Sequence, residues 1–236
     1  MKEEYAMKVR VKFSKHGVMK FIGHLDIMRY FQKAIRRAEI PIKFTEGFSP
    51  HMVMSFASPL GVGLTSDGEY MDIEITEAVP SAEAVKRLND VMVEGMRVLS
   101  FRQIPEGKAN NAMALVAYAD YTVSFREGKE PGCDWKEKLS EFAALPEITV
   151  TKKTKKNEKE VDIRPMIRIL KLQETGEIFM RLSSGSASNL KPELVMEAFA
   201  SWLGTELAPF ALLVNRVELY DGNMVSLEEL GEEIGE

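Results

Sequence analysis

The chain has 236 residues, of which 45% are hydrophobic and 28% are charged, and its formal net charge is -5. This composition excludes extensive disorder and fits one large or two small globular domains. The single cysteine, Cys133, excludes an internal disulfide and a zinc site built from thiolates, which favours a reducing compartment. The first residues lack a signal-peptide core, and no run approaches the ~20 apolar residues of a membrane span. We therefore expect a cytoplasmic protein.

The charge is distributed unevenly along the chain. Residues 8–56 contain ten basic residues against three acidic ones, and residues 152–171 contain eight against three. Residues 217–236 contain seven acidic residues and no basic one. The net negative charge is therefore compatible with an anionic partner that binds one of the basic segments.

Strand and helix periodicities alternate over the first hundred residues. Residues 7–13, MKVRVKF, alternate apolar and basic side chains, which predicts a half-buried strand with Lys8, Arg10 and Lys12 on one face. Residues 23–39 have an apolar stripe at helical spacing, with basic residues on the other side. Further along we predict extended stretches at 40–46, 52–57 and 69–76, a helix at 81–96 and a strand at 97–104. Apart from one additional extended stretch, the predicted order of elements is βαββαβ.

The pattern restarts after residues 105–115, whose turn residues and weak periodicity predict a linker. We then predict strands at 117–125, 147–154 and 211–221, helices at 133–145 and 191–203, and a hairpin of residues 161–174 and 177–184. Pro165 weakens the first arm of this hairpin or places it at a sheet edge. The sequence thus predicts an α+β fold with tandem ferredoxin-like βαββαβ units at 1–104 and 116–222, followed by an acidic C-terminal tail at 223–236.

Two long segments resemble a known family. They are FIGHLDIMRYFQKAIRRAEIPIKFTEGFSPHMVMSFASPLGVGLTSDGEYMDIEI and TKKTKKNEKEVDIRPMI. Both are similar to the radical-SAM-linked protein family, a bacterial domain of unknown function that occurs alone or fused to cobalamin-binding-type radical SAM enzymes, with genes that tend to lie beside those of ribonuclease G and ribosomal proteins. The resemblance implies a radical SAM enzyme as partner. A chain with one cysteine cannot supply the thiolate triad of such a cluster, so the partner would hold the cofactor and this chain none.

Two groups of cations are candidates for phosphate contacts. The first is the polar side of the predicted helix at 23–39, with Arg29, Lys33, Arg36 and Arg37, and the second is the lysine run Lys152, Lys153, Lys155 and Lys156. Lysine and arginine side chains bind a nucleic-acid backbone without reading its sequence. The alternative interpretation is the ordinary solvated face of an amphipathic helix.

A recognition site is predicted from five further residues: His24, Phe48, His51, Asp162 and Arg164. Phe48 and His51 belong to EGFSPHMVMSFASP, residues 46–59, where Gly47 and Pro50 predict a turn, so only exposure of the two side chains would make this loop a binding edge. Asp162 and Arg164 would share one face of a strand, either as a structural ion pair or with Arg164 free to bind an anion. The spacing of the three histidines matches no common zinc motif, so we predict no metal site.

These residues favour a noncatalytic accessory protein that binds RNA, such as ribosomal or transfer RNA, or another polyanion, and that works with a radical SAM enzyme in RNA modification. One alternative is a metal-independent endoribonuclease that resembles CRISPR repeat-processing enzymes, with His16 or His24 as proton-transfer groups. Another is a pure protein-interaction module whose basic face docks on an acidic enzyme surface.

Overall fold

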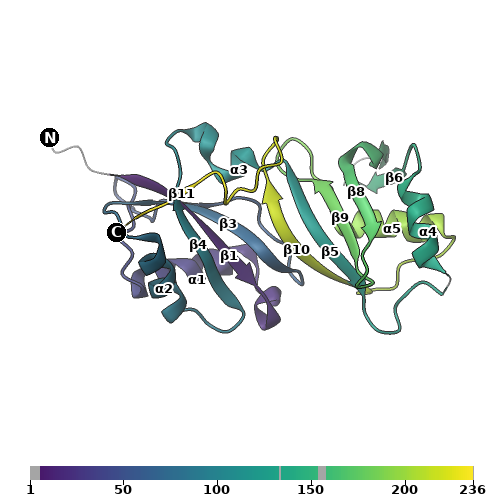
Figure 1. Cartoon of the computed structure of the whole chain (residues 1–236), viewed down its shortest axis with the longest axis horizontal. Helices are drawn as coiled ribbons and strands as arrows, with labels where there is room; N and C mark the ends of the chain where they lie inside the picture. The colour runs from purple at the N-terminus through teal and green to yellow at the C-terminus, as the bar shows by residue number, and fades with distance from the viewer. Residues whose placement is uncertain (1–5, 133, 154–157, 236) are drawn as a thin grey trace. The chain divides into compact units, whose positions relative to one another are not determined.

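The computed structural model describes residues 6–132, 134–153 and 158–235, and the chain divides into two compact units. Unit 1 consists of Met1–Ala117 and Glu218–Glu236, and unit 2 of Tyr118–Val217. The described residues contain five α-helices and eleven β-strands, so the protein is a mixed α/β structure (Figure 1). Within this part of the chain, no helix is long and apolar enough to cross a membrane.

The sheet of unit 1 is built from strands of both its sequence segments. Its strands are β1 (Met7–Lys15), β2 (Met54–Phe56), β3 (Thr65–Ile75), β4 (Met96–Gln103) and β11 (Glu232–Glu233). They lie in the order β11-β4-β1-β3, with β2 paired to β3, and every one of these pairs is antiparallel. The central strand β1 has the predicted alternation, because Val9, Val11 and Phe13 are buried in the hydrophobic core while Lys8, Arg10 and Lys12 occupy the opposite face.

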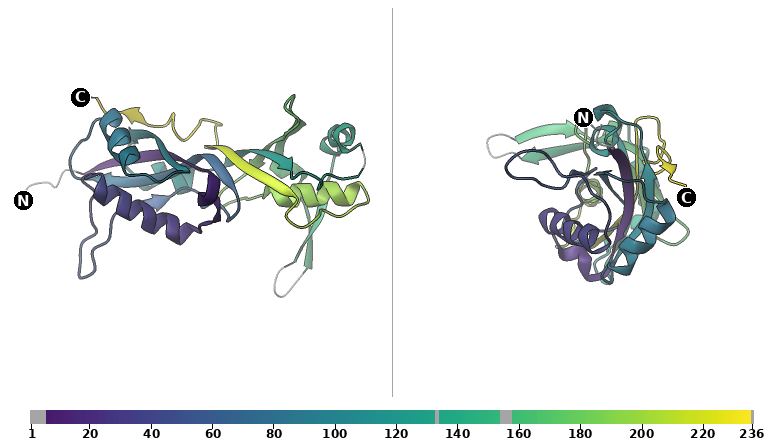
Figure 2. Two further views of the ribbon diagram at one scale, coloured as in Figure 1. Left: turned by 90° about the horizontal axis from the view of Figure 1, so that it is seen from below. Right: turned by 90° about the vertical axis from the view of Figure 1, so that its left-hand side faces the viewer.

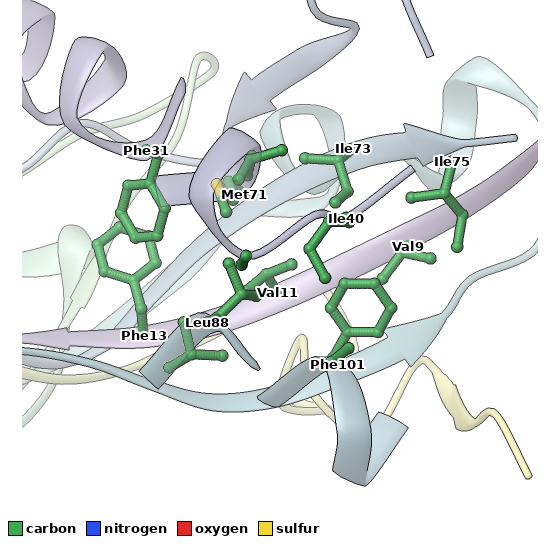
Figure 3. Packing of buried hydrophobic residues seen from close by; sticks show 14 of the residues in the cluster. Val9, Val11, Phe13, Phe31, Ile40, Met71, Ile73, Ile75, Leu88 and Phe101 are labelled. Carbon is green, nitrogen blue, oxygen red and sulfur yellow. The ribbon is translucent and has the colours of Figure 1, made fainter. Parts of the chain in front are cut away.

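Two helices, α1 (His24–Arg37) and α2 (Ser81–Asp90), cover the apolar face of this sheet. The predicted stripe is confirmed, since Ile27, Phe31, Ala34 and Ile35 are all buried in α1. The rings of Phe31 and Phe13 lie with their centroids 4.6 Å apart (Figure 3). Burying one such ring stabilises the fold by about 1.5–3 kcal/mol, so these contacts fix α1 against β1 and direct its other side outward.

The segment between α1 and β3 differs from the predicted strands. Residues 40–46 form no strand, and only isolated bridges join Ile42 to Ile75 and Phe44 to Met52. Of the stretch predicted at 52–57, only β2 is a strand. The reason is that the chain leaves the sheet edge here and returns, so a ladder forms only where it lies against β3. Figure 2 shows this loop, in dark blue, projecting from unit 1.

The acidic C-terminal segment is part of unit 1. Strand β10 (Leu212–Tyr220) begins in unit 2, and its last three residues belong to unit 1. Further along, Glu232 and Glu233 pair with Gln103 and Arg102 of β4. The predicted linker, residues 105–115, contains the 3-10 helix η2 (Lys108–Asn110) and the short α3 (Ala112–Leu115), both inside unit 1.

Unit 2 contains a four-stranded sheet and a separate hairpin. Its strands are β5 (Tyr118–Phe125), β6 (Thr149–Lys153), β7 (Glu158–Asp162), β8 (Ile167–Leu172), β9 (Ile178–Ser183) and β10, and its helices are α4 (Trp135–Ala143) and α5 (Pro192–Trp202). The sheet order is β10-β5-β9-β8, whereas β6 pairs, within the described part of the chain, only with β7. The rings of Phe142 and Phe199 lie 5.1 Å apart between α4 and α5.

The predicted hairpin of residues 161–174 and 177–184 is shorter in the structure. Residues 161 and 162 belong to β7, Arg164–Met166 form the 3-10 helix η3, and β8 begins only at Ile167. Pro165 lies at the start of η3, where a proline is tolerated because its missing N–H leaves no helical hydrogen bond unmade. The hairpin proper is β8 and β9, with β8 at the edge of the sheet.

Candidate functional site

The basic face of α1 is exposed from Arg29 to the end of the helix. Arg29, Lys33, Arg36 and Arg37 all lie on the solvent side. Arg29 contacts the carboxylate of Asp26 at 3.3 Å, in a pair whose members are 68% and 62% exposed. Exposed pairs of this kind contribute little stability and are screened by salt, so this contact leaves Arg29 available to another anion. Lys33, Arg36 and Arg37 form no ion pair among the described residues.

The loop between Thr45 and His51 presents Phe48 to solvent. The amide of Thr45 donates to the carbonyl oxygen of His51 at 2.9 Å, and the amide of His51 donates to Thr45 Oγ1 at 3.1 Å. The His51 ring also lies 3.0 Å from this hydroxyl. These hydrogen bonds join the two ends of the loop. Gly47 supplies the positive φ of 107° that the turn requires. The side chain of Phe48, at the tip of the loop, is fully exposed.

His24 occupies a different environment at the first turn of α1. Its ring meets the edge of Phe56 at a centroid distance of 5.2 Å and lines a cavity of about 20 Å³. Lys15 and Glu69, which are 2% and 6% exposed, line the same cavity. This volume suits about one water molecule rather than a base or a cofactor. His24 is therefore partly a packing residue, although its ring lies beside two buried charged groups.

His16 and Asp67 form an exposed pair at the end of β1. The Nε2 atom of His16 lies 2.9 Å from Asp67 Oδ1, with the two side chains 44% and 52% exposed. The three histidines thus have three different partners: Asp67 for His16, Phe56 for His24 and Thr45 for His51. In the part of the chain that the structure describes, no group of three or more His, Cys, Asp or Glu side chains is arranged to hold a metal ion.

Asp162 and Arg164 lie in unit 2, whereas His24, Phe48 and His51 lie in unit 1. The Asp162 carboxylate accepts hydrogen bonds from the amides of Ile148 and Arg164, both at 2.9 Å. The Arg164 guanidinium donates to the carbonyl oxygens of Leu145 at 3.0 Å and Ile167 at 2.8 Å. Both side chains therefore hold main-chain segments together, because β7 ends at Asp162 and the two residues no longer share a strand face.

The second lysine group is only partly within the described residues. Lys152 and Lys153 lie in β6, opposite Lys159 and Glu158 of β7, and their side chains are not among those described. Lys155 and Lys156 lie outside the described residues. The candidate phosphate contacts whose side chains are described are therefore those of α1.

The cations Arg10 and Lys12 of β1 are held inside unit 1, so they do not add to the exposed basic face of α1. Arg10 is 2% exposed and forms two hydrogen bonds with the carboxylate of Asp72, its neighbour on β3, at 2.8 and 3.0 Å. It also donates to the carbonyl oxygens of Leu227 at 3.2 Å and Asn110 at 2.7 Å. A guanidinium with these four bonds is not available to a phosphate.

Lys12 is held in the same way by the acidic C-terminal segment. Its Nζ atom lies 2.7 Å from both Glu218 Oε2 and Glu228 Oε2, and Tyr70 donates to Glu218 at 2.6 Å. Burial would lower the pKa of Lys12, but its hydrogen bonds to the two carboxylates outweigh burial and raise it. Burial likewise would raise the pKa of Glu228, which the hydrogen bond from Lys12 lowers instead. Burial and the charge of Glu218 raise the pKa of Tyr70.

Sequence reasoning missed this polar cluster, which is defined by Lys12, Tyr70, Glu218 and Glu228. It borders an open polar groove of about 590 Å³ lined by Arg102, Glu218, Tyr220, Met224, Ser226, Glu228 and Glu229. The only sequence signal was the opposite charge of two segments about two hundred residues apart, and pairing between them depends on the fold. Through these bonds the cluster holds the C-terminal segment against the polar face of β1.

The fold and site can be compared with known proteins. The model of a protein family described as an uncharacterized protein conserved in bacteria (DUF2344) matches residues 8–192. The chain belongs to this family. The DUF2344 match includes α1, the loop at Phe48 and Arg164, and it ends at the first residue of α5. The carboxylates that bind Lys12 lie beyond it.

No curated protein matches this DUF2344 chain. Among solved structures, one described as an unknown protein from Galdieria sulphuraria matches with 10% sequence identity and a TM-score of 0.29, over 92% of this chain and 99% of that chain. A TM-score this low carries no argument about fold or function.

Proposed function

We propose that this protein is a noncatalytic accessory factor that binds RNA through unit 1. The observation that carries the proposal is the exposed face of α1, where four cations follow one side of a helix anchored by its buried opposite side. Among the described residues, only Arg29 has a carboxylate partner on this face, and that pair is exposed. A row of exposed cations with so little internal neutralisation is suited to a phosphate backbone.

Phe48 supports the choice of RNA over a simple polyanion. Its ring is fully exposed at a loop tip whose base is closed by hydrogen bonds between Thr45 and His51. An exposed aromatic ring of this kind can stack on an unpaired base, and each such stack contributes about 1–3 kcal/mol to binding of single strands. A polyanion without bases would use the cations alone.

The test is binding of a labelled single-stranded RNA, measured by fluorescence anisotropy over a range of salt concentrations. Each phosphate contact contributes about 0.7 to the slope of log affinity against log salt for a single strand. We therefore expect the Lys33→Gln, Arg36→Gln double variant to bind more weakly and to reduce the magnitude of the slope by about 1.4. Phe48→Ala should weaken RNA binding without reducing the slope.

The matched control removes two exposed cations elsewhere in unit 1, with the Lys86→Gln, Arg97→Gln double variant. It changes the net charge equally and should leave the slope nearly unchanged. If both double variants weaken binding equally, net charge and not α1 governs the interaction. Affinity that does not respond to salt, or no RNA binding at low salt, would end the proposal.

We further propose that a separate radical SAM enzyme is the partner, which is what the sequence resemblance implies. An exposed apolar cluster of Val18, Phe21, Leu25 and Val62 at the start of α1 supports a protein contact. The loop carrying Val62 joins this cluster, because the amide of Gly63 donates to the carbonyl oxygen of Lys20 at 2.7 Å. Such a cluster beside the basic face would let one surface contact both an enzyme and its RNA.

Affinity purification of the tagged chain from its own cells, with and without nuclease, tests the partner. We expect a radical SAM enzyme to be recovered in both samples and lost with Phe21→Ser, Leu25→Ser. Recovery that requires intact RNA would mean that the two proteins meet only through RNA. If no radical SAM enzyme is recovered in either sample, the proposed partner is wrong.

A second candidate function is RNA cleavage, which the His16–Asp67 pair favours. Asp67 lies 2.9 Å from Nε2 of an exposed histidine, and a carboxylate in that position orients an imidazole for proton transfer. Incubation of RNA with the wild-type chain and with the His16→Ala, His24→Ala double variant separates the two functions. If the wild type cleaves RNA and the variant does not, the protein is an enzyme rather than an accessory factor. If the variant still cleaves RNA, the two histidines are not the proton-transfer groups.

We also infer that both units are ferredoxin-like. The strand order β4-β1-β3-β2 in unit 1 supports this inference, as does the order β10-β5-β9-β8 in unit 2. Each unit contains a strand, a helix, two strands, a helix and a strand in this order, as a βαββαβ unit requires. The β6–β7 hairpin is an insertion in unit 2. An experimental structure of each unit would test the assignment.

A further inference from the structure

Unit 2 contains a groove that neither the basic face of α1 nor the histidines use. Its volume is about 450 Å³, and residues of β6 and of α5 line it. Phe142 of α4 and Leu145, which follows α4, complete the apolar lining. Leu194, Ala198 and Trp202 form the α5 wall. The indole of Trp202 is 39% exposed, which leaves a large apolar surface facing the groove. A groove of this size admits a short chain segment.

The β6 wall of the groove is a strand with one open edge. Among the described residues, β6 pairs only with β7. The pair of Ile148 and Ile163 is hydrogen-bonded, since the amide of Ile163 donates to the carbonyl oxygen of Ile148 at 2.8 Å. Backbone groups alternate in direction along an antiparallel strand, so the N–H and C=O groups of Thr149 and Thr151 point away from β7. Both residues line the groove.

An open strand edge in a folded protein is usually paired with another strand or covered by a helix or loop. Unpaired strand edges are templates for pairing with another chain, and an isolated two-stranded hairpin is marginally stable in water. The hairpin of β6 and β7, in green in Figure 2, projects away from the four-stranded sheet of its own unit. A third strand in the groove would satisfy the open edge and bury the exposed part of Trp202.

The charges of the groove define the ligand further. Glu147 and Glu197 both line the groove and are exposed. Glu147 accepts a hydrogen bond from the hydroxyl of Thr149 at 2.8 Å, and neither carboxylate forms an ion pair among the described residues. The described lining includes no basic side chain. The groove is therefore complementary to a segment that carries Lys or Arg beside an apolar residue.

We propose that this groove binds an extended segment of a partner protein, which adds as a third strand to the open edge of β6. Main-chain hydrogen bonds to Thr149 and Thr151 would hold the segment, as in other cases of strand addition. An apolar side chain would lie against Trp202, and a Lys or Arg would face Glu147 and Glu197. The edge from Thr149 to Thr151 has room for about three residues at ~3.3 Å each. Because α5 forms the opposite wall, the groove admits one extended chain rather than the folded edge of a second copy. The proposal does not depend on RNA binding by α1.

The test uses the full chain and three blocked hexapeptides. One alternates Lys and Val, the second replaces each Lys with Glu, and the third replaces the central Val with Pro. Binding is measured by calorimetry, and the contacted residues are identified from ¹⁵N amide shifts. We expect the Lys–Val peptide to bind at least about tenfold more tightly than the other two and to shift the amides of Thr149 and Thr151.

Two variants and one control localise the binding. Glu197→Lys should reverse the preference between the Lys and Glu peptides. Thr151→Pro removes an edge N–H that does not face β7, so it should weaken binding of the Lys–Val peptide while the β6–β7 pairing persists. Glu174→Lys makes the same charge change in the exposed turn between β8 and β9 and should change nothing.

Three results would overturn the proposal. The first is no binding of the Lys–Val peptide at millimolar concentration, and the second is equal affinity for all three peptides. The third is a dimer in sedimentation that Thr151→Pro dissociates, because a second copy would then occupy the edge. If Thr151→Pro fails to fold, Glu197→Lys decides alone: equal effects of Glu197→Lys and Glu174→Lys would place any binding outside the groove.

Discussion

The cations of α1 and those of β1 look alike in the sequence and have opposite positions in the structure. Arg29, Lys33, Arg36 and Arg37 are exposed on α1. Arg10 and Lys12 of β1 are held by carboxylates from residues 62 and 206 positions further along the chain. The difference shows that a basic segment is a surface for anions only if no distant acidic segment folds onto it.

The helix and the strand differ for a physical reason. The polar side of a surface helix has no structural partner, because the apolar stripe alone fixes the helix to the core. A central strand of an antiparallel sheet has two faces, and the face opposite the core is either solvated or covered by another segment. In unit 1 the C-terminal segment covers the polar side of β1, so its cations need buried partners rather than solvent.

The largest expected effect comes from breaking the buried pair on β1. Asp72→Ala leaves Arg10 without its carboxylate and the amide of Ala112 without its acceptor. Removing one member of a buried ion pair costs about 3–5 kcal/mol, so the free energy of unfolding should fall by that amount in urea denaturation. A loss below about 1 kcal/mol would mean that Arg10 bonds water or another acceptor in the variant. The buried cations of β1 would then differ less from the exposed cations of α1.

A smaller loss should follow Lys12→Met. This variant leaves Glu218 and Glu228 without their shared cation, while the aliphatic part of the side chain still packs. We expect a loss of about 1–3 kcal/mol at neutral pH by urea denaturation. The comparison variant is Lys8→Met, because the Lys8 side chain bonds only Asn111, at 3.4 Å, among the residues that the structure describes. This variant should lose about 0.5 kcal/mol of stability or less. Equal losses would show that the carboxylates do not hold Lys12.

The alkaline pH dependence of stability should depend on Tyr70. Its pKa is raised by burial and by Glu218, so the folded state keeps the proton when the unfolded state loses it near pH 10.0. The stability that this group contributes is present below the unfolded pKa and is lost as pH rises. By pH 11 the wild type should lose about 1 kcal/mol that Tyr70→Phe does not lose. Parallel curves for the two proteins between pH 9 and 11 would contradict the assignment.

The smallest effect on stability is expected from the face of α1. The Lys33→Gln, Arg36→Gln double variant should change the free energy of unfolding by no more than about 0.5 kcal/mol, because exposed charges without buried partners contribute little to stability. Its loss of RNA affinity must then come from lost contacts rather than from unfolding. Destabilisation comparable to that of Lys12→Met would indicate that these cations have a structural role.

Part of the fold was predictable because its signals are local. The spacing of Ile27, Phe31, Ala34 and Ile35 predicts a helix with one buried side, and all four are buried. The alternation of residues 7–13 likewise predicts the two faces of β1. Both predictions rest on the period of an element and need no knowledge of its neighbours.

The candidate site was predictable only in part. The basic face of α1 follows from the helical period, and the turn at Gly47 follows from its sequence. Whether Phe48 is exposed depends on whether the loop folds back on the core, and it does not. The expectation that Asp162 and Arg164 share a strand face is wrong, because β7 ends at Asp162 and Arg164 lies in η3. Both side chains bond main-chain groups instead.

The periodicity of the chain determines which side of each element is apolar, and this was enough to predict the core of unit 1 and the exposed cations of α1. Only the tertiary structure decides which polar groups meet. The contacts of Lys12 with Glu218 and Glu228 join residues more than two hundred positions apart. The edge of β6 is open because no other strand of the described residues pairs with it. Both depend on where the backbone brings distant segments, because a charge or a strand edge in the sequence carries no information about its partner.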